Sequence, residues 1–136
     1  MQTKLVQNKS ILTRTTGYLQ KVSSHSLNPY SGCGFGNSSC GQGCYVRFNS
    51  WVNQGRQWGS FVDIKANAAD LYSQTANREK SWTTKRSEPF SIFMSSSTDP
   101  WQPAEGKYRI TRKVLQAMRT IPPDELILQT HSSAIL

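Results

Sequence analysis

The chain has 136 residues, of which 36% are hydrophobic and 18% charged, and its formal net charge at pH 7 is +8. The length suits one small domain or a piece of a larger protein, and the composition fits neither a charge-rich disordered tail nor a leucine-rich bundle. No window approaches the roughly 18 consecutive apolar residues of a membrane span, and no secretory signal opens the chain. We therefore expect a cytoplasmic protein with no membrane partner.

The positive charge favours polyanionic partners, among them nucleic acid. The basic residues are scattered along the chain, however, and no run of five or more forms a basic tail. A solvated surface also accounts for this distribution. Charge alone does not identify a partner.

Residues 1–24 are polar, with isolated apolar positions, and predict an irregular N-terminal leader. The segment that follows, residues 25–47, contains all three cysteines of the chain, Cys33, Cys40 and Cys44, together with five glycines. This glycine density excludes a helix or a regular strand, and it permits the close backbone approach that wrapping three side chains around one centre requires. A flexible linker is the alternative, but linkers do not concentrate every thiol of a chain. We therefore predict a binding loop.

The rest of the chain alternates strand and helix patterns of βαβ length, which predicts a parallel α/β sheet or barrel. Asn67, with Asp70 three positions later, predicts a helix cap, and Thr111 predicts another. Glu105 reads as a surface acid on the approach to the second helix. The predicted elements are a strand at 61–65, a helix from 68 to about 80, a strand at 89–97, a helix from 111 to about 121 and a strand at 125–130.

In such folds the chemistry lies at the carboxyl ends of the strands. Two polar clusters follow the predicted strands, one at Ser96, Thr98 and Asp99 and the other at residues 130–132. The chain then ends at Leu136 with no helix to cover the last strand, and a parallel sheet exposed there is unfavourable. We therefore expect the N-terminal part of a longer protein or a truncated product.

Three thiolates on one loop suit two kinds of metal centre. Structural zinc takes four protein ligands, so His25 or His131 would have to complete a Cys₃His site. A [4Fe–4S] cluster held by three thiolates keeps one iron open to a substrate or cofactor. Ligand type does not separate the two metals, but a single glycine-rich loop with no distant cysteine pair favours the cluster. A non-catalytic basic zinc module that binds nucleic acid remains the alternative.

The segment NPYSGC at residues 28–33, followed by Cys40, Cys44 and Tyr45, resembles the cluster-binding loop of radical S-adenosylmethionine proteins. More narrowly, it is similar to their spore photoproduct lyase-like branch. The resemblance covers roughly residues 25–134, and its matched segments occur in the same order along the chain. The further matched segments are 61–65, 67–69, 97–105, 110–112 and 129–132.

The resemblance implies a partial (β/α) barrel, with residues 25–136 as the N-terminal part of the radical S-adenosylmethionine core domain, truncated after the third strand. It implies an enzyme that binds a [4Fe–4S] cluster and reductively cleaves S-adenosylmethionine to a 5′-deoxyadenosyl radical, with an electron donor such as a flavodoxin or ferredoxin. Nucleic acid is a candidate substrate, and this chain alone is expected to be incomplete and inactive. The implied cluster ligands are Cys33, Cys40 and Cys44, and the implied cofactor-binding residues also include Tyr45, Ser96, Thr98, Asp99, His131 and Ser132.

Two features depart from that family's pattern. The cysteine spacing is C-x6-C-x3-C instead of the usual C-x3-C-x2-C, and the aromatic residue before the third cysteine is displaced to Tyr45. His131 stands where the family motif commonly has lysine, and the charge of a histidine near pH 7 is conditional. The four tryptophans, Trp51, Trp58, Trp82 and Trp101, predict packing more than stacking against nucleobases.

Overall fold

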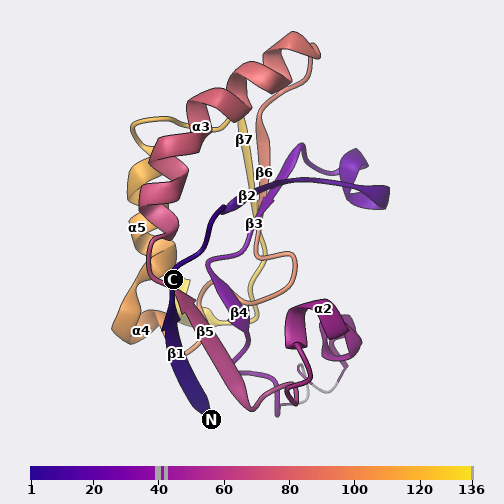
Figure 1. Ribbon diagram of the computed structural model, residues 1–136, viewed down its shortest axis with the longest axis vertical. Coiled ribbons are helices and arrows are strands. Elements are labelled where there is room, and N and C mark those ends of the chain that lie inside the picture. Colours follow the sequence, from indigo (N-terminus) through magenta and orange to yellow (C-terminus); the bar gives the residue numbers. More distant parts are fainter. Residues whose placement is uncertain (39–40, 42, 136) are drawn as a thin grey trace.

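The computed structural model describes residues 1–38, 41 and 43–135. These residues form two β-sheets beside a pair of packed helices (Figure 1). The strands are β1 (Gln2–Val6), β2 (Leu12–Arg14), β3 (His25–Leu27), β4 (Tyr30–Gly32), β5 (Phe61–Lys65), β6 (Ser91–Met94) and β7 (Glu125–Leu128). The helices are α2 (Ser50–Asn53), α3 (Ala68–Lys85), α4 (Glu105–Tyr108) and α5 (Ile110–Met118), with short 3-10 helices η1 (Gly17–Lys21), η2 (Tyr45–Phe48) and η3 (Ser133–Ile135).

The four-stranded sheet has the order β2-β3-β6-β7. Strands β3, β6 and β7 run parallel, and β2 pairs antiparallel with β3. Strand β6 lies between β3 and β7, and its Ile92 and Met94 side chains are completely buried. On the opposite face Ser91 is buried and Phe93 is partly buried, so both faces are covered, as expected for an inner parallel strand.

Helices α3 and α5 connect β5 to β6 and β6 to β7, and they pack against each other on one side of the sheet (Figure 1). Their apolar faces supply Tyr72 and Val114 to a core that also contains Ile92. Among the described residues, no helix has both the length and the apolar composition needed to cross a bilayer.

The three-stranded sheet has the order β1-β5-β4. Strand β5 has the predicted bounds, and its alternate residues Val62 and Ile64 enter the core. Strand β1 pairs parallel with β5, placing Leu5 opposite Ile64, and β4 pairs antiparallel with it. Thus residues 1–24, predicted to be irregular, contain two strands, because partners distant in the sequence order them.

The predicted fold class, the N-terminal portion of a partial (β/α) barrel truncated after its third strand, is wrong. The described residues form two separate mixed sheets, of three and four strands, and close no barrel. The sequence patterns indicated only three strands, because the first four lie in polar or glycine-rich segments. Strand formation in such segments depends on tertiary pairing more than on intrinsic preference.

Asn67 occupies the predicted N-cap position of α3 but makes no capping hydrogen bond with its side chain, and the predicted cap at Thr111 is wrong because Arg109 holds that position. The Asn67 Nδ2 instead donates to the Asn8 carbonyl at 2.8 Å, and its Oδ1 accepts from the Asn8 N–H at 3.0 Å. The start of α5 is capped by Glu105, whose carboxylate accepts from the N–H groups of Thr111 at 2.9 Å and Arg112 at 3.0 Å. Glu105 is therefore buried and not the surface acid that was expected.

Candidate functional site

A cavity of about 120 Å³ lies between the cysteine loop, residues 33–44, and the segments that follow β6 and β7. Because these strands run parallel, the polar segments after them meet at one edge of the sheet. Ser132 lies outside this cysteine cavity, and Cys40 is not among the described residues. The predicted site residues that line it are Cys33, Cys44, Tyr45, Ser96, Thr98, Asp99 and His131.

Cys33 directly follows β4 and is held by its two neighbours. A Cβ atom at Gly32, where φ is +83°, would lie 2.4 Å from the Phe61 carbonyl oxygen, so this turn requires glycine. The buried Gln102 accepts from the Gly34 N–H at 2.8 Å and donates to the Gly32 carbonyl at 3.3 Å. One side-chain amide therefore brackets the cysteine on both sides.

Thr98 belongs to the same support. Gln102 Nε2 donates to the Thr98 hydroxyl at 2.9 Å, and that hydroxyl donates to the Gly32 carbonyl at 2.6 Å. In this arrangement Thr98 positions the cysteine loop. Gln102 was not among the predicted site residues; the available signal was a polar residue between Pro100 and Pro103, in the segment after a buried strand.

Asp99 joins the segments that follow β6 and β7. Its buried carboxylate accepts from the Trp101 N–H at 2.9 Å, the Thr130 hydroxyl at 2.6 Å and the His131 N–H at 2.8 Å. These contacts use both carboxylate oxygens inside the protein. Asp99 therefore orients His131 at the edge of the cavity.

Tyr45 connects the cysteine loop to the end of β6. Its hydroxyl donates to the Ser96 carbonyl, and burial raises the pKa of this hydroxyl above its ordinary value. Asn28, from the matched NPYSGC segment, donates to the Ser96 hydroxyl at 3.4 Å and accepts from the Ser97 N–H at 3.0 Å. The turn after β6 is thus held from two directions.

Two residues that line the cysteine cavity each have a buried polar group with no hydrogen-bond partner within the described part of the chain, the indole nitrogen of Trp58 and the hydroxyl of Ser95. The two residues are 5% and 6% exposed. Ser95 also has φ of 69°, which is uncommon for a residue other than glycine. Since an unsatisfied buried polar group costs about 1–3 kcal/mol, the cavity has the character of a site that a ligand completes.

The two histidines lie in different environments. His131 lines the cysteine cavity. His25 is completely buried at the start of β3, with Nε2 2.9 Å from a Glu79 oxygen and Nδ1 2.8 Å from the Ser24 hydroxyl. Because both ring nitrogens are engaged, His25 does not suit the fourth position of a zinc site. Within the described ranges, no three or more His, Cys, Asp or Glu side chains are grouped to hold a metal.

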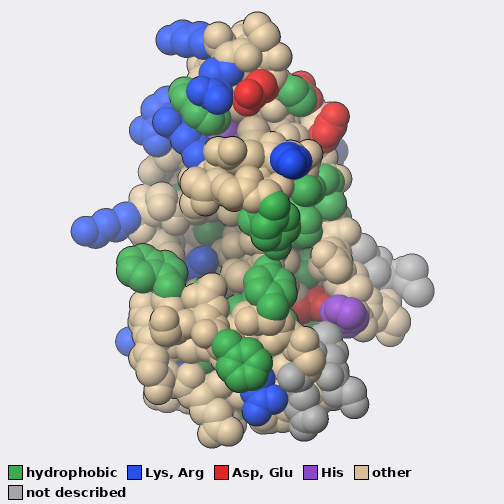
Figure 2. All heavy atoms as spheres, turned by 90° about the vertical axis from the view of Figure 1, so that its right-hand side faces the viewer, with side chains coloured by type: hydrophobic (Ala, Val, Ile, Leu, Met, Phe, Trp, Pro, Cys, Tyr) green, Lys and Arg blue, Asp and Glu red, His purple; other side chains and the backbone are tan. Residues whose placement is uncertain are grey.

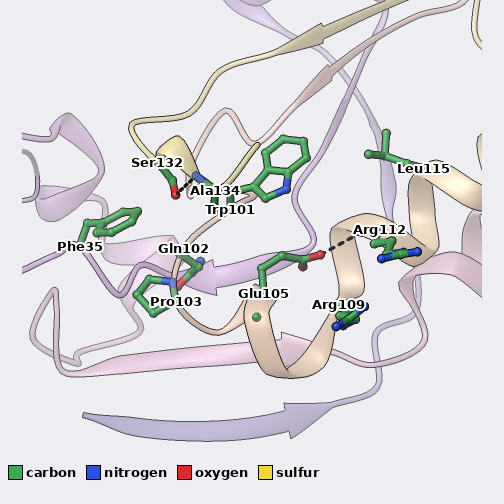
Figure 3. A pocket seen from close by; sticks show the side chains of 11 residues that line it. Phe35, Trp101, Gln102, Pro103, Glu105, Arg109, Arg112, Leu115, Ser132 and Ala134 are labelled. Carbon is green, nitrogen blue, oxygen red and sulfur yellow. Dashed lines mark hydrogen bonds between the residues drawn. The ribbon is translucent and has the colours of Figure 1, made fainter. Parts of the chain in front are cut away.

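Ser132 lines a neighbouring cavity of about 540 Å³, which shares Phe35 with the cysteine cavity. Figure 3 shows Arg109 and Arg112 at the end of this second cavity away from Phe35. The Ser132 hydroxyl accepts from the Ala134 N–H at 3.1 Å. Ser132 therefore lines a different cavity from the other described site residues, although its N–H donates to the Thr130 hydroxyl at 3.0 Å.

Exposed aromatic side chains follow the cysteine loop. Phe48 is 82% exposed and Trp51 85% exposed, and the Arg47 guanidinium lies 5.7 Å from the centre of the Phe48 ring. Exposed hydrophobic side chains gather on the face that carries α2 (Figures 1 and 2). This aromatic surface, Arg47, Phe48 and Trp51, combines flat rings with a positive charge.

The chain is similar to an uncharacterized protein, MJ0683, from Methanocaldococcus jannaschii, with 33% identity over 111 residues. The alignment covers 81% of this chain and 36% of that protein, so the chain spans about a third of the length of that relative. No family model matches the chain. No solved structure matches it either.

Proposed function

We propose that the protein binds a [4Fe–4S] cluster through Cys33, Cys40 and Cys44 and acts with S-adenosylmethionine as a radical enzyme of the spore photoproduct lyase-like kind. The observation that carries the proposal is the cysteine cavity. There, Cys33 and Cys44 lie opposite the polar segments after two parallel strands.

The donor set in this cavity fits an iron–sulfur cluster. Thiolates are the usual ligands of such clusters, and Cys33 packs with Val46 and Trp58 in a small apolar cluster that limits solvent access. The unsatisfied groups of Trp58 and Ser95 offer hydrogen bonds to a bound cofactor. When bound, the cluster supplies the electron for reductive cleavage of S-adenosylmethionine.

The polar residues of the cavity divide into two roles in this proposal. Thr98 and Asp99 use their side chains within the protein, so they position the loops around the cofactor. Ser95, Ser96 and His131 line the cavity and are the side chains that contact S-adenosylmethionine. A small one-electron donor, such as a flavodoxin or ferredoxin, supplies the electron in the cytoplasm, where thiols stay reduced.

Anaerobic reconstitution of the chain with iron and sulfide tests the metal site. The expected product is brown and contains about four iron atoms per chain. Single substitutions of Cys33, Cys40 and Cys44 by alanine should each remove most of the bound iron. A colourless protein that holds one zinc would contradict the proposal. This chain alone is expected to form no 5′-deoxyadenosine from S-adenosylmethionine and dithionite, so the iron content, and not turnover, tests the proposal.

We further propose single-stranded nucleic acid as the substrate class, which the aromatic surface supports. Exposed rings stack on bases, and a net charge of +8 attracts phosphates. Trp51→Ala should weaken binding of a labelled oligonucleotide by roughly 5- to 150-fold, since each stacked base contributes about 1–3 kcal/mol. Leu126→Ala, an exposed apolar position on β7, is the control. Wild-type binding that is absent at low salt would exclude this substrate class.

A further inference from the structure

The Trp58 side chain is buried without a hydrogen-bond acceptor in the described structure. Its ring packs edge-to-face on Phe61, with centroids 6.4 Å apart and an angle of 81° between the planes. The residue is only 5% exposed, and its indole nitrogen has no partner among the described residues. A buried indole N–H normally donates to an acceptor, because leaving it unpaired is unfavourable.

The backbone beside Trp58 is clamped against the cysteine loop. A Cβ atom at Gly36 would lie 2.4 Å from the Gly59 Cα, so the two chain segments touch at their glycines. Asn37 of the cysteine loop also donates to the Gly59 carbonyl at 3.2 Å. These contacts restrict the residue that precedes Gly59, and they hold its ring beside Cys33 in the small apolar cluster.

The cysteine cavity has two chemically different sides. Ser95 belongs to the polar side, with Ser96, Thr98, Asp99 and His131. Trp58 belongs to the sulfur side, where it packs in the same apolar cluster as Cys33 and next to Cys44. Cysteine sulfur atoms, and any sulfide of a group that they hold, are therefore the acceptors that this side could offer to the Trp58 N–H.

We propose that the Trp58 indole N–H donates a hydrogen bond to a sulfur atom of the cysteine-held cluster and raises the reduction potential of that cluster. This inference rests on the proposed function. Thiolate and sulfide sulfurs are anionic acceptors, and hydrogen bonds to them tune the potentials of iron–sulfur centres. Reduction adds negative charge, so the donor stabilises the reduced cluster more than the oxidised one. Trp58 is thus a positioning residue that acts through the cluster.

A redox titration of the reconstituted chain, followed by electron paramagnetic resonance, tests this role. Trp58→Phe keeps an aromatic ring and removes the donor, and it should lower the midpoint potential. The expected change is three- to tenfold in the reduction equilibrium, where tenfold corresponds to about 59 mV for one electron. Trp51→Phe removes the same group from a side chain that is 85% exposed, and it should leave the potential unchanged.

A second variant covers the possibility that phenylalanine disturbs the packing. Replacing Trp58 by β-(3-benzothienyl)alanine substitutes sulfur for the indole N–H in a ring of nearly the same shape. A potential below that of the wild type in this variant supports the inference. Wild-type potentials in both Trp58 variants, with the cluster intact, would overturn it and leave the proposed function standing. Failure of the wild-type chain to assemble any cluster would contradict the proposed function itself.

Discussion

Buried polar side chains gather near both ends of the parallel strands, but their hydrogen bonding differs. Near the start of β3, His25 and Arg14 both contact Glu79 Oε1 at 2.9 Å, and Arg14 also reaches Glu79 Oε2 at 3.3 Å. In the cysteine cavity, at the opposite end, Trp58 and Ser95 each keep a buried polar atom with no partner in the described structure.

The first cluster is complete within the protein. Burial by itself would raise the pKa of Glu79, but the hydrogen bonds from Arg14 and His25 outweigh it and lower that pKa to about 2. Trp82 closes the cluster, with the Arg14 guanidinium 4.1 Å from its ring centre. The comparison shows that unsatisfied groups, more than the number of polar residues, distinguish a candidate binding site from a structural network.

The largest expected effect is a difference in iron binding between variants of the cysteine cavity and variants of the Glu79 cluster. Cys33→Ala should abolish most cluster assembly, because it removes one of the three proposed ligands, and it should change the free energy of unfolding of the iron-free chain far less. Glu79→Ala should instead lower the free energy of unfolding strongly and change the bound iron far less. Iron analysis after reconstitution, alongside denaturant unfolding, measures both. Full iron content in Cys33→Ala would remove this distinction.

Glu79→Ala should destabilise the fold by about 3–5 kcal/mol, because it leaves Arg14 and the buried His25 without their shared partner. The matched control is Glu88→Ala. Glu88 is 46% exposed and pairs with Arg86 at 3.6 Å, and such surface pairs contribute about 0–1 kcal/mol. Urea unfolding at pH 7 measures the two variants. Equal losses of unfolding free energy in the two variants would show that the buried network stabilises the fold no more than a surface ion pair does.

Stability should also depend on pH through Glu79. Its pKa is lowered from 4.5 to about 2 in the folded chain, so the ionised carboxylate favours folding. This contribution is fully present above the unfolded-state pKa near 4.5, and it is lost as the pH falls toward 2. The difference in free energy of unfolding between the wild type and Glu79→Gln should therefore decrease over that pH range by on the order of 3 kcal/mol. A difference in free energy of unfolding that does not change with pH would contradict a lowered pKa at Glu79.

Gln102→Ala should destabilise the chain by about 1–3 kcal/mol, because the Gly34 N–H loses its acceptor. Cluster content should fall as well, since Gly34 loses its support and Gly32 keeps only the hydrogen bond from Thr98. Gln116→Ala, on the exposed side of α5, is the control for removing a glutamine amide. An unchanged iron content in the Gln102 variant would indicate that the loop holds its shape without this amide.

The smallest expected effects come from the same serine-to-alanine substitution made in the cysteine cavity and near the Glu79 cluster. Ser95→Ala removes a hydroxyl without a described partner, so stability should stay within about 0.5 kcal/mol or rise. Ser23→Ala removes a buried hydroxyl that donates to the His25 carbonyl at 2.9 Å, and it should cost about 1 kcal/mol. Thermal unfolding of the iron-free chain measures both. A larger loss at Ser95 would mean that its hydroxyl has a partner in the folded chain.

The local spacing of apolar residues was sufficient to predict the helices and strands with strong hydrophobic periodicity. Strand β5 has the predicted bounds, and α3, α5, β6 and β7 lie where apolar spacing indicated them. The short strands before them were missed, since their stability depends on pairing such as that of β1 with β5. The cap of α5 was missed for a similar reason. Glu105 reaches the helix start from its own short helix, and no local sequence rule describes that contact.

The sequence by itself determined that the chain concentrates its thiols on one glycine-rich loop and places polar residues after its apolar strands. These features depend on residue identity and on short spacing. Tertiary structure alone decided that Gln102 hydrogen-bonds on both sides of Cys33 and that His25 binds Glu79. It also decided that the Trp58 side chain lies in one cluster with Cys33 while its N–H has no partner among the described residues. Hydrogen-bond satisfaction depends on which atoms meet in space, and residues 70 positions apart, such as Gly32 and Gln102, meet only when the chain folds.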